Sequence, residues 1–219
     1  LAFFEFTNTD LLIQEHLYLP AEKTWVLKDP HLFYRALFYT AIKIPIYIIG
    51  ALALGATIIS WKKQKWHEYR KGLIIVTLSL IILPLSVAVI GKNMTNVQCP
   101  DDLNHFAGKI PYVKLFDSYP KNPESLDGKF RRGHCFPAGH ASGGFALLSL
   151  VCFFRERKNK IWAFVFAMSM GWTMGVYQML RGAHFLSHHL TTMILALILV
   201  STLNQLIKDF ENVSPATEK

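Results

Sequence analysis

The sequence predicts an all-α membrane protein, a polytopic bundle of five or six transmembrane helices. Of its 219 residues, 52% are hydrophobic and only 17% are charged, which is more apolar surface than one soluble core of this size usually buries. The apolar residues gather into uncharged blocks of about 20 residues, the length that a helix needs to cross a bilayer. No internal repeat is visible, so we expect a single integral membrane domain over residues 1–219.

Five blocks predict the spans. Four of them are uncharged and long enough to cross a membrane: residues 44–60, 72–91, 161–180 and 190–207. The fifth, residues 136–154, is rich in glycine and carries His140 near its start. It therefore predicts a helix whose first turn lies at the interface or in a polar cavity. The chain does not begin with methionine, which leaves room for an earlier helix in the full gene product as a sixth span.

The basic residues predict the orientation. Lysine and arginine are concentrated in residues 61–71 and 155–160, and such loops face the cytoplasm by the positive-inside rule. Two spans separate these loops, so both lie on one side, and residues 92–136 and 181–189 face outward. The net charge of +8 then needs only anionic lipid headgroups as a partner and no nucleic acid.

Two of the three cysteines lie near the ends of the outward segment. Cys99 and Cys135 could form a disulfide in an oxidising compartment, whereas Cys152 falls inside an apolar block. The alternative is a pair of free thiols, since a sequence does not show whether two Cα atoms lie within bonding range.

The histidines are distributed unevenly. A lone histidine usually caps a helix or satisfies a hydrogen bond in a core, but most of the nine histidines here fall on the outward side. Ionisable groups at a membrane edge are costly unless they face a cavity, so this clustering favours one shared site. The outward histidines are His105, His134, His140, His184, His188 and His189.

The order of the polar residues suits phosphate chemistry. Lys92 ends one predicted span, Gly139 and His140 open the next helix, and Arg181 and His184 precede the last one. A helix N-terminus with a glycine offers free N–H groups and a positive dipole end to an anion. The lysine and the arginine would neutralise phosphate oxygens, while one histidine attacks phosphorus and the other protonates the departing oxygen.

This pattern resembles the type 2 phosphatidic acid phosphatase (PAP2) family of membrane lipid phosphatases, whose signature is KxxxxxxRP, PSGH and SRxxxxxHxxxD. The resemblance covers the region from Lys92 to His188, in the family's order and spacing. It implies a PAP2-like fold, His184 as the nucleophile, His140 as the acid for the leaving group, and no metal or other cofactor. The matching residues are Lys92, Pro100, Pro137, Gly139, His140 and His184.

Several motif positions differ from the signature. Arg181 is the natural substitute for the missing motif arginine, because three residues before His184 on a helix is nearly the same face as six. His188 replaces the aspartate that orients the nucleophile. It can accept a hydrogen bond from His184, but it cannot stabilise a cation as a carboxylate does. The other departures are Cys99, Ala138, Tyr177 and Gln178.

Other functions compete with this interpretation. His184 and His188 have the i, i+4 spacing of a metal site, although no HExxH or paired-cysteine motif is present. The chain could also bind a phosphorylated headgroup without catalysis, or transfer phosphate between lipids. The GxxxG pair Gly171 and Gly175 is best explained by helix packing.

The sequence thus predicts a metal-independent phosphatase that removes a phosphate monoester or diphosphate from a membrane lipid through a phosphohistidine. His184, His140 and His188 are the expected catalytic residues, and Lys92, Arg181 and Gly139 the expected substrate-binding ones. The substrate is a phosphorylated membrane lipid that enters sideways: isoprenyl diphosphate, phosphatidylglycerophosphate, phosphatidic acid or lipid A. The loop charges and the resemblance together suggest a bacterial inner membrane, with the site on the periplasmic side.

Overall fold

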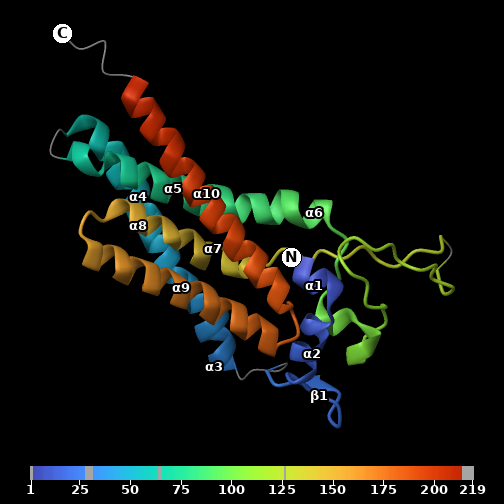
Figure 1. Cartoon of the computed structure of the whole chain (residues 1–219). Coiled ribbons are helices and arrows are strands. Elements are labelled where there is room, and N and C mark those ends of the chain that lie inside the picture. Colours follow the sequence, from blue (N-terminus) through green and yellow to red (C-terminus); the bar gives the residue numbers. More distant parts are fainter. Residues whose placement is uncertain (1, 28–31, 64–65, 126, 214–219) are drawn as a thin grey trace.

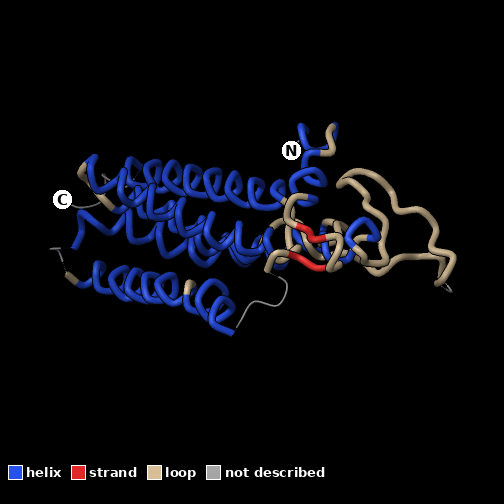
Figure 2. Tube along the Cα trace, turned by 90° about the horizontal axis from the view of Figure 1, so that it is seen from below, coloured by secondary structure: helices blue, strands red, loops and turns tan. Residues whose placement is uncertain are grey.

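Long helices lie side by side in one bundle, and a largely non-helical segment extends from one end of it (Figures 1 and 2). The computed structural model describes residues 2–27, 32–63, 66–125 and 127–213. The bundle comprises α4 (Lys43–Lys62), α5 (His67–Leu85), α7 (Gly139–Ala146), α8 (Leu150–Phe153), α9 (Arg157–Leu180) and α10 (Leu186–Val213). A 3-10 turn, η6 (Leu147–Ser149), joins α7 to α8.

The short helix α7 packs against α4, α5, α9 and α10. Its Phe145 is fully buried in a core to which Leu83 of α5, Met174 of α9 and Ala196 of α10 also belong. The backbones of α7 and α9 approach so closely that a β-carbon on Gly144 would lie only 2.7 Å from the Cα of Gly171. The first turn of α7, which carries Gly139 and His140, is therefore held by the packing of the whole bundle.

The membrane prediction is confirmed in part. Among the described residues, three helices are long and apolar enough to cross a bilayer: Phe33–Lys62, His67–Met94 and Leu186–Ile207. Gly139–Phe153 is a shorter apolar helix, and α9 covers its predicted block but begins with the charged residues Arg157 and Lys158. The count of five or six spans stays a prediction.

Two helices are extended by π-helical turns at the same end of the bundle. α3 (Leu32–Arg35) and η1 (Ala36–Ala41) lead into α4, while η3 (Ser86–Gly91) joins α5 to α6 (Lys92–Met94). Such turns displace the residues after them relative to a regular helix and are frequent at functional sites. Here they place Tyr39 and Lys92.

The N-terminal residues cover this end of the bundle. They form α1 (Ala2–Phe6), α2 (Thr9–Glu15) and an antiparallel pair of short strands, β1 (Tyr18–Leu19) and β2 (Thr24–Trp25). The all-α prediction did not include this hairpin. Trp25 packs with Leu103, Phe106 and Phe185. Two 3-10 turns lie in the loop segment, η4 (Pro100–Asp102) and η5 (Asn104–Phe106).

The arrangement of the loops agrees with the predicted even number of crossings. The α4–α5 and α8–α9 turns, which carry the basic residues, lie at one end of the bundle (Figure 1). Residues 92–136 and 181–185 lie at the other end, which we call the site end. That the site end faces outward stays a prediction.

Candidate active site

Two histidines meet where α9 turns into α10. His184, in the connecting turn, is 5% exposed, and its Nδ1 lies 3.3 Å from Nδ1 of His188 in the first turn of α10. The ring of His188 also hydrogen-bonds to the backbone of Cys135. The Cys135 N–H donates to Val97, so His188 donates to the Cys135 carbonyl. His188 can then accept a hydrogen bond from His184, which leaves Nε2 of His184 with a free lone pair.

The environment of His184 favours its neutral form. Burial lowers the pKa of His184 well below its usual 6.5, and the neighbouring His188, His189, Lys92 and His140 lower this pKa further. Lys92 and His140 are thus near enough to act electrostatically on His184. That these residues share one catalytic site stays a prediction.

The start of α7 is tied to the same place. The ammonium nitrogen of Lys92 lies 3.6 Å from where a β-carbon on Gly139 would stand. The N–H of Ala138 donates to the carbonyl of His188 over 3.3 Å, and the Thr192 hydroxyl donates to the carbonyl of Ala138 over 3.1 Å. Lys92 thus lies beside a helix N-terminus whose glycine leaves space for an anion.

Tyr39 connects several of these groups. Its ring lies 4.5 Å from that of His140, centroid to centroid. The ammonium of Lys43 lies 4.3 Å above the Tyr39 ring, and the guanidinium of Arg181 lies 5.9 Å from it. The charges of Lys43, Lys92 and Arg181 all act on His140. No motif in the sequence indicates Tyr39 or Lys43, although the position of Lys43 directly before an uncharged block is a usable signal.

A cavity of about 600 Å³ opens beside this cluster. Its polar end is formed by Lys43, Lys92 and His140. The rest of the lining is mostly apolar and comes largely from α4 and α5, including Ala51, Leu54, Leu80, Ile81 and Pro84. The cavity is within the usual size range of ligand pockets, with few polar groups among apolar ones. A cavity with basic residues at one end and apolar walls suits a molecule with an anionic head and a hydrocarbon chain.

Comparison with known proteins agrees with this geometry. Residues 72–211, more than half of the chain, match the model of the PAP2 superfamily. The chain belongs to the PAP2 superfamily. It is also 26% identical to a lipid A 4'-phosphatase from Francisella tularensis subsp. novicida (strain U112) over 194 residues, which cover 84% of this chain and 80% of the relative. No solved structure gives a significant match.

The family match includes most of the candidate site residues but not all of them. Lys92, Gly139, His140, Arg181, His184 and His188 all lie within the matched residues 72–211. Tyr39 and Lys43 lie before them, so the match gives no information on these two residues.

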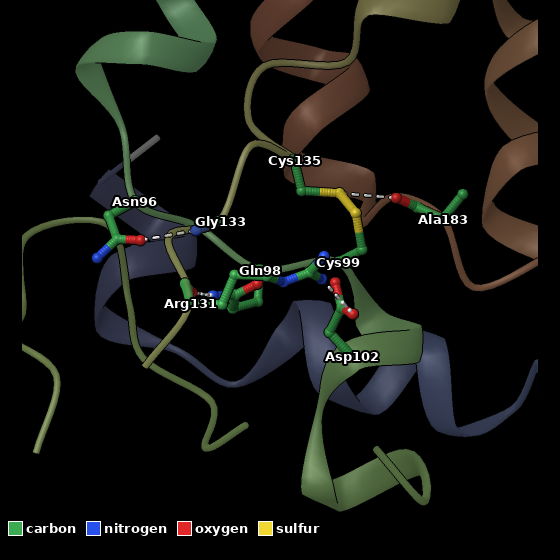
Figure 3. A network of polar contacts seen from close by, with 8 residues as sticks. All are labelled: Asn96, Gln98, Cys99, Asp102, Arg131, Gly133, Cys135 and Ala183. Carbon is green, nitrogen blue, oxygen red and sulfur yellow. Dashed lines mark hydrogen bonds and ion pairs between the residues drawn. A yellow bond between two sulfur atoms is a disulfide. The ribbon is translucent and has the colours of Figure 1, made fainter. Parts of the chain in front are cut away.

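The site end of this PAP2 protein contains the disulfide that the sequence suggested. Cys99 and Cys135 are joined with a Cα–Cα distance of 5.2 Å (Figure 3). One sulfur, that of Cys135, lies 2.8 Å from the carbonyl oxygen of Ala183, next to His184. Arg131 forms an ion pair with Asp102 over 3.0 Å and accepts a hydrogen bond from Gln98 at its carbonyl. The disulfide thus connects the two ends of the loop segment to the turn that carries His184.

The disulfide also bears on the metal alternative. Among the described residues, two groups of side chains could hold an ion: Cys135 with His184 and His188, and Cys99 with Asp101 and Asp102. Each group needs a cysteine thiolate, but both sulfurs are bonded to each other. Neither sulfur can act as a thiolate ligand while the disulfide is intact.

Two of the other outward histidines lie apart from His184, and a third lies beside it. His105 lies 2.6 Å from Glu15 and is exposed, and His134 lies near the backbone carbonyl of Lys92. His189 is fully buried, with its ring 5.4 Å from that of His184. A β-carbon on Gly175 would lie 3.1 Å from the His189 ring, so Gly175 leaves room for an imidazole.

Helix α2 holds both sides of the turn that carries His184. A carboxylate oxygen of Asp10 accepts the N–H of Ser187 over 3.0 Å, which caps the start of α10. The amide of Gln14 donates to the carbonyl of Met179 over 2.7 Å, near the end of α9. Both side chains are buried, and burial raises the pKa of Asp10 while its hydrogen bonds with Ser187 lower it. No sequence motif indicated this clamp.

We expect Asp10→Ala to destabilise the site end of this PAP2 protein. The substitution leaves the buried N–H of Ser187 without its acceptor, at a cost of about 1–2 kcal/mol in unfolding free energy. Thermal unfolding in detergent would show a lower Tm, and phosphatase activity would fall with it. Asp10→Asn keeps an acceptor oxygen and should recover most of the loss.

Glu15→Ala is the matched control for this prediction. Glu15 lies on the same helix but makes an exposed ion pair with His105, which is worth little. An Asp10→Ala protein as stable as Glu15→Ala would show that the cap contributes nothing.

Proposed function

We propose that this PAP2 protein is a metal-independent membrane lipid phosphatase that works through a phosphohistidine on His184. The family match and the lipid A 4'-phosphatase relative support a lipid phosphatase. The observation that carries the mechanism is the orientation of His184: Nδ1 faces Nδ1 of His188, which leaves Nε2 as the nucleophile, and Lys92 and His140 act electrostatically on the ring. Such a held, desolvated imidazole is suited to attack phosphorus.

The reaction has two steps. In the first, Nε2 of His184 forms a bond to phosphorus while the bond from phosphorus to the lipid oxygen breaks, and His140 gives that oxygen a proton. Lys92, Arg181 and the N–H groups at the start of α7 hold the phosphate oxygens. In the second step, water attacks phosphorus, His140 takes a proton from it, and phosphate leaves His184.

The cavity supports a lipid as the substrate. Its apolar walls from α4 and α5 would hold the hydrocarbon chain while the head reaches Lys92 and His140, and the substrate would enter sideways from the bilayer. The relative makes lipid A the first candidate. Isoprenyl diphosphate, phosphatidylglycerophosphate and phosphatidic acid follow. We place the site on the periplasmic side of an inner membrane, as the basic turns at the opposite end favour.

Phosphate release in detergent tests this proposal. The four lipid classes are each incubated with the purified protein, with and without EDTA. We expect phosphate from at least one class at a rate that EDTA does not change. Loss of activity with EDTA would contradict metal independence, and no release from any class would overturn the proposed function. Phosphate recovered on an added lipid acceptor would indicate transfer instead.

The pH dependence of kcat/KM should reflect the burial of His184. Because burial and the neighbouring groups lower its pKa below 6.5, His184 stays unprotonated, and hence nucleophilic, at pH values below 6.5. We therefore expect the acid limb of the kcat/KM profile, where His184 becomes protonated, to lie below pH 6.5, while loss of the proton that His140 donates sets the alkaline limb. An acid limb that is half complete at or above pH 6.5 would contradict this environment.

A further inference from the structure

Three cations gather around His140. Lys43 comes from α4, Lys92 from α6, and Arg181 from the turn after α9, and all three act electrostatically on His140. Between described residues, ion pairs join His105 to Glu15, Arg131 to Asp102, and Arg155 to Glu68. None of them involves the three cations, so no carboxylate of the described residues neutralises this group.

The positive charge exceeds what one phosphate requires. A phosphate monoester carries about two negative charges near neutral pH. Lys92 and Arg181 match this charge, and both belong to the family-matched part of the chain. Lys43 then remains as a third positive charge, and it lines the cavity together with Lys92.

The position of Lys43 favours a role in ligand binding over a role as an anchor at the membrane interface. A lysine at a helix end in a membrane commonly extends toward the headgroups to keep its charge in water. Here the ammonium of Lys43 lies above the Tyr39 ring, at 4.3 Å from the centroid, and Lys43 lines the cavity together with Lys92 and His140. Because the Tyr39 ring also contacts His140, it holds Lys43 next to the reaction site.

An aromatic partner leaves the lysine charge available. A cation–π contact positions an ammonium group without cancelling its charge, whereas a carboxylate would cancel it. Lys43 is thus held beside the site in a form that can still bind an anion. The π-helical turn Ala36–Ala41, which carries Tyr39 directly before α4, makes this arrangement possible.

We infer that Lys43 binds a second anionic group on the substrate's own headgroup, adjacent to the phosphate that is hydrolysed. This inference rests on the proposed function and narrows its substrate class to lipids whose head carries a further phosphate near the scissile one. Lys43 lies outside the family-matched residues. It therefore adds selectivity for the headgroup to a reaction performed by the motif residues.

Two matched pairs of lipids test the inference. Farnesyl diphosphate and farnesyl phosphate share one chain and differ by a directly bonded second phosphate. Phosphatidylglycerophosphate and phosphatidic acid differ by a phosphodiester one glycerol away. In at least one pair, we expect Lys43→Gln to lower kcat/KM about tenfold more for the lipid with the additional phosphate than for its partner. This is the loss that removal of a charge-assisted hydrogen bond predicts.

Control variants separate charge from structure. Lys43→Arg keeps the charge and should keep the preference. Lys62→Gln removes an exposed lysine at the opposite end of α4, and it should change neither pair. If the second anion came from free phosphate or a neighbouring lipid, the effect of Lys43→Gln would depend on added inorganic phosphate or on anionic lipid in the micelle. Such a dependence would contradict a group on the substrate itself.

The outcomes distinguish the two proposals. Equal losses for both members of both pairs, in a wild-type protein that hydrolyses them, would overturn the role of Lys43 and leave the phosphatase intact. A wild-type protein that hydrolyses none of these four lipids would overturn this inference, and one that also releases no phosphate from lipid A would overturn the proposed function.

Discussion

Replacing His184 by alanine is expected to lower the rate of phosphate release by more than about a thousandfold, the scale on which enzymes lose a nucleophile. The substitution removes the protein atom that the mechanism bonds to phosphorus. His188, which is held by the carbonyl of Cys135, is not free to take over. Single-turnover incubation with a ³²P-labelled lipid should yield an acid-labile phosphoprotein from the wild-type protein and none from His184→Ala.

The control for this prediction is another histidine at the site end. His105→Ala removes an exposed imidazole that pairs with Glu15 and should leave phosphate release within about twofold of the wild-type rate. Both variants should run as the wild-type protein does on size-exclusion chromatography in detergent. A His184→Ala protein that folds and keeps a tenth of the wild-type rate would contradict the assignment of the nucleophile.

The sequence predicted the features that depend on local patterns. Blocks of uncharged residues became long helices because only a helix satisfies its backbone in hydrocarbon. The two basic turns lie at one end of the bundle, as the predicted even number of spans between them requires. The block over 136–154 was predicted as one helix, and Gly139–Phe153 is one apolar helix in which Leu147–Ser149 has 3-10 geometry.

The sequence did not predict the residues that reach the site from far along the chain. Gln14 and its partner Met179 are separated by 165 positions, and Asp10 and Ser187 by 177. No periodicity or spacing connects such pairs, because only the packed bundle brings them together. Tyr39 was missed for a related reason: its direction depends on a π-helical turn, which changes the face that a residue presents and leaves no mark in the hydrophobic pattern.

The substitution of His188 for the motif aspartate is explained by its surroundings. A carboxylate there would be buried beside Phe136 and Phe185, whose rings lie 5.2 Å and 5.4 Å from that of His188. A neutral imidazole costs less to bury than a charge. It still orients His184, because it accepts at one nitrogen and donates to the Cys135 carbonyl at the other. The orientation of the proposed nucleophile is thus kept, while the electrostatic support of a carboxylate is given up.

A second large effect is expected for His140→Ala, and its size should depend on the leaving group. The Nε2 of His140 is buried and has no hydrogen-bond partner among the described residues, so it is available to a substrate oxygen. An alkoxide leaves poorly without a proton, and the loss of a general acid costs about 10²–10⁴-fold for such substrates. A nitrophenolate or a phosphate leaves well unprotonated, so nitrophenyl phosphate and lipid diphosphates should lose only about tenfold or less. Single-turnover rates on alkyl and aryl phosphates measure this difference. The control is His16→Ala, which removes a ring that contacts the Leu12 carbonyl one turn before it.

Equal losses on all leaving groups would instead assign His140 to phosphate binding, because a residue that holds the phosphoryl oxygens contributes the same stabilisation whichever group departs.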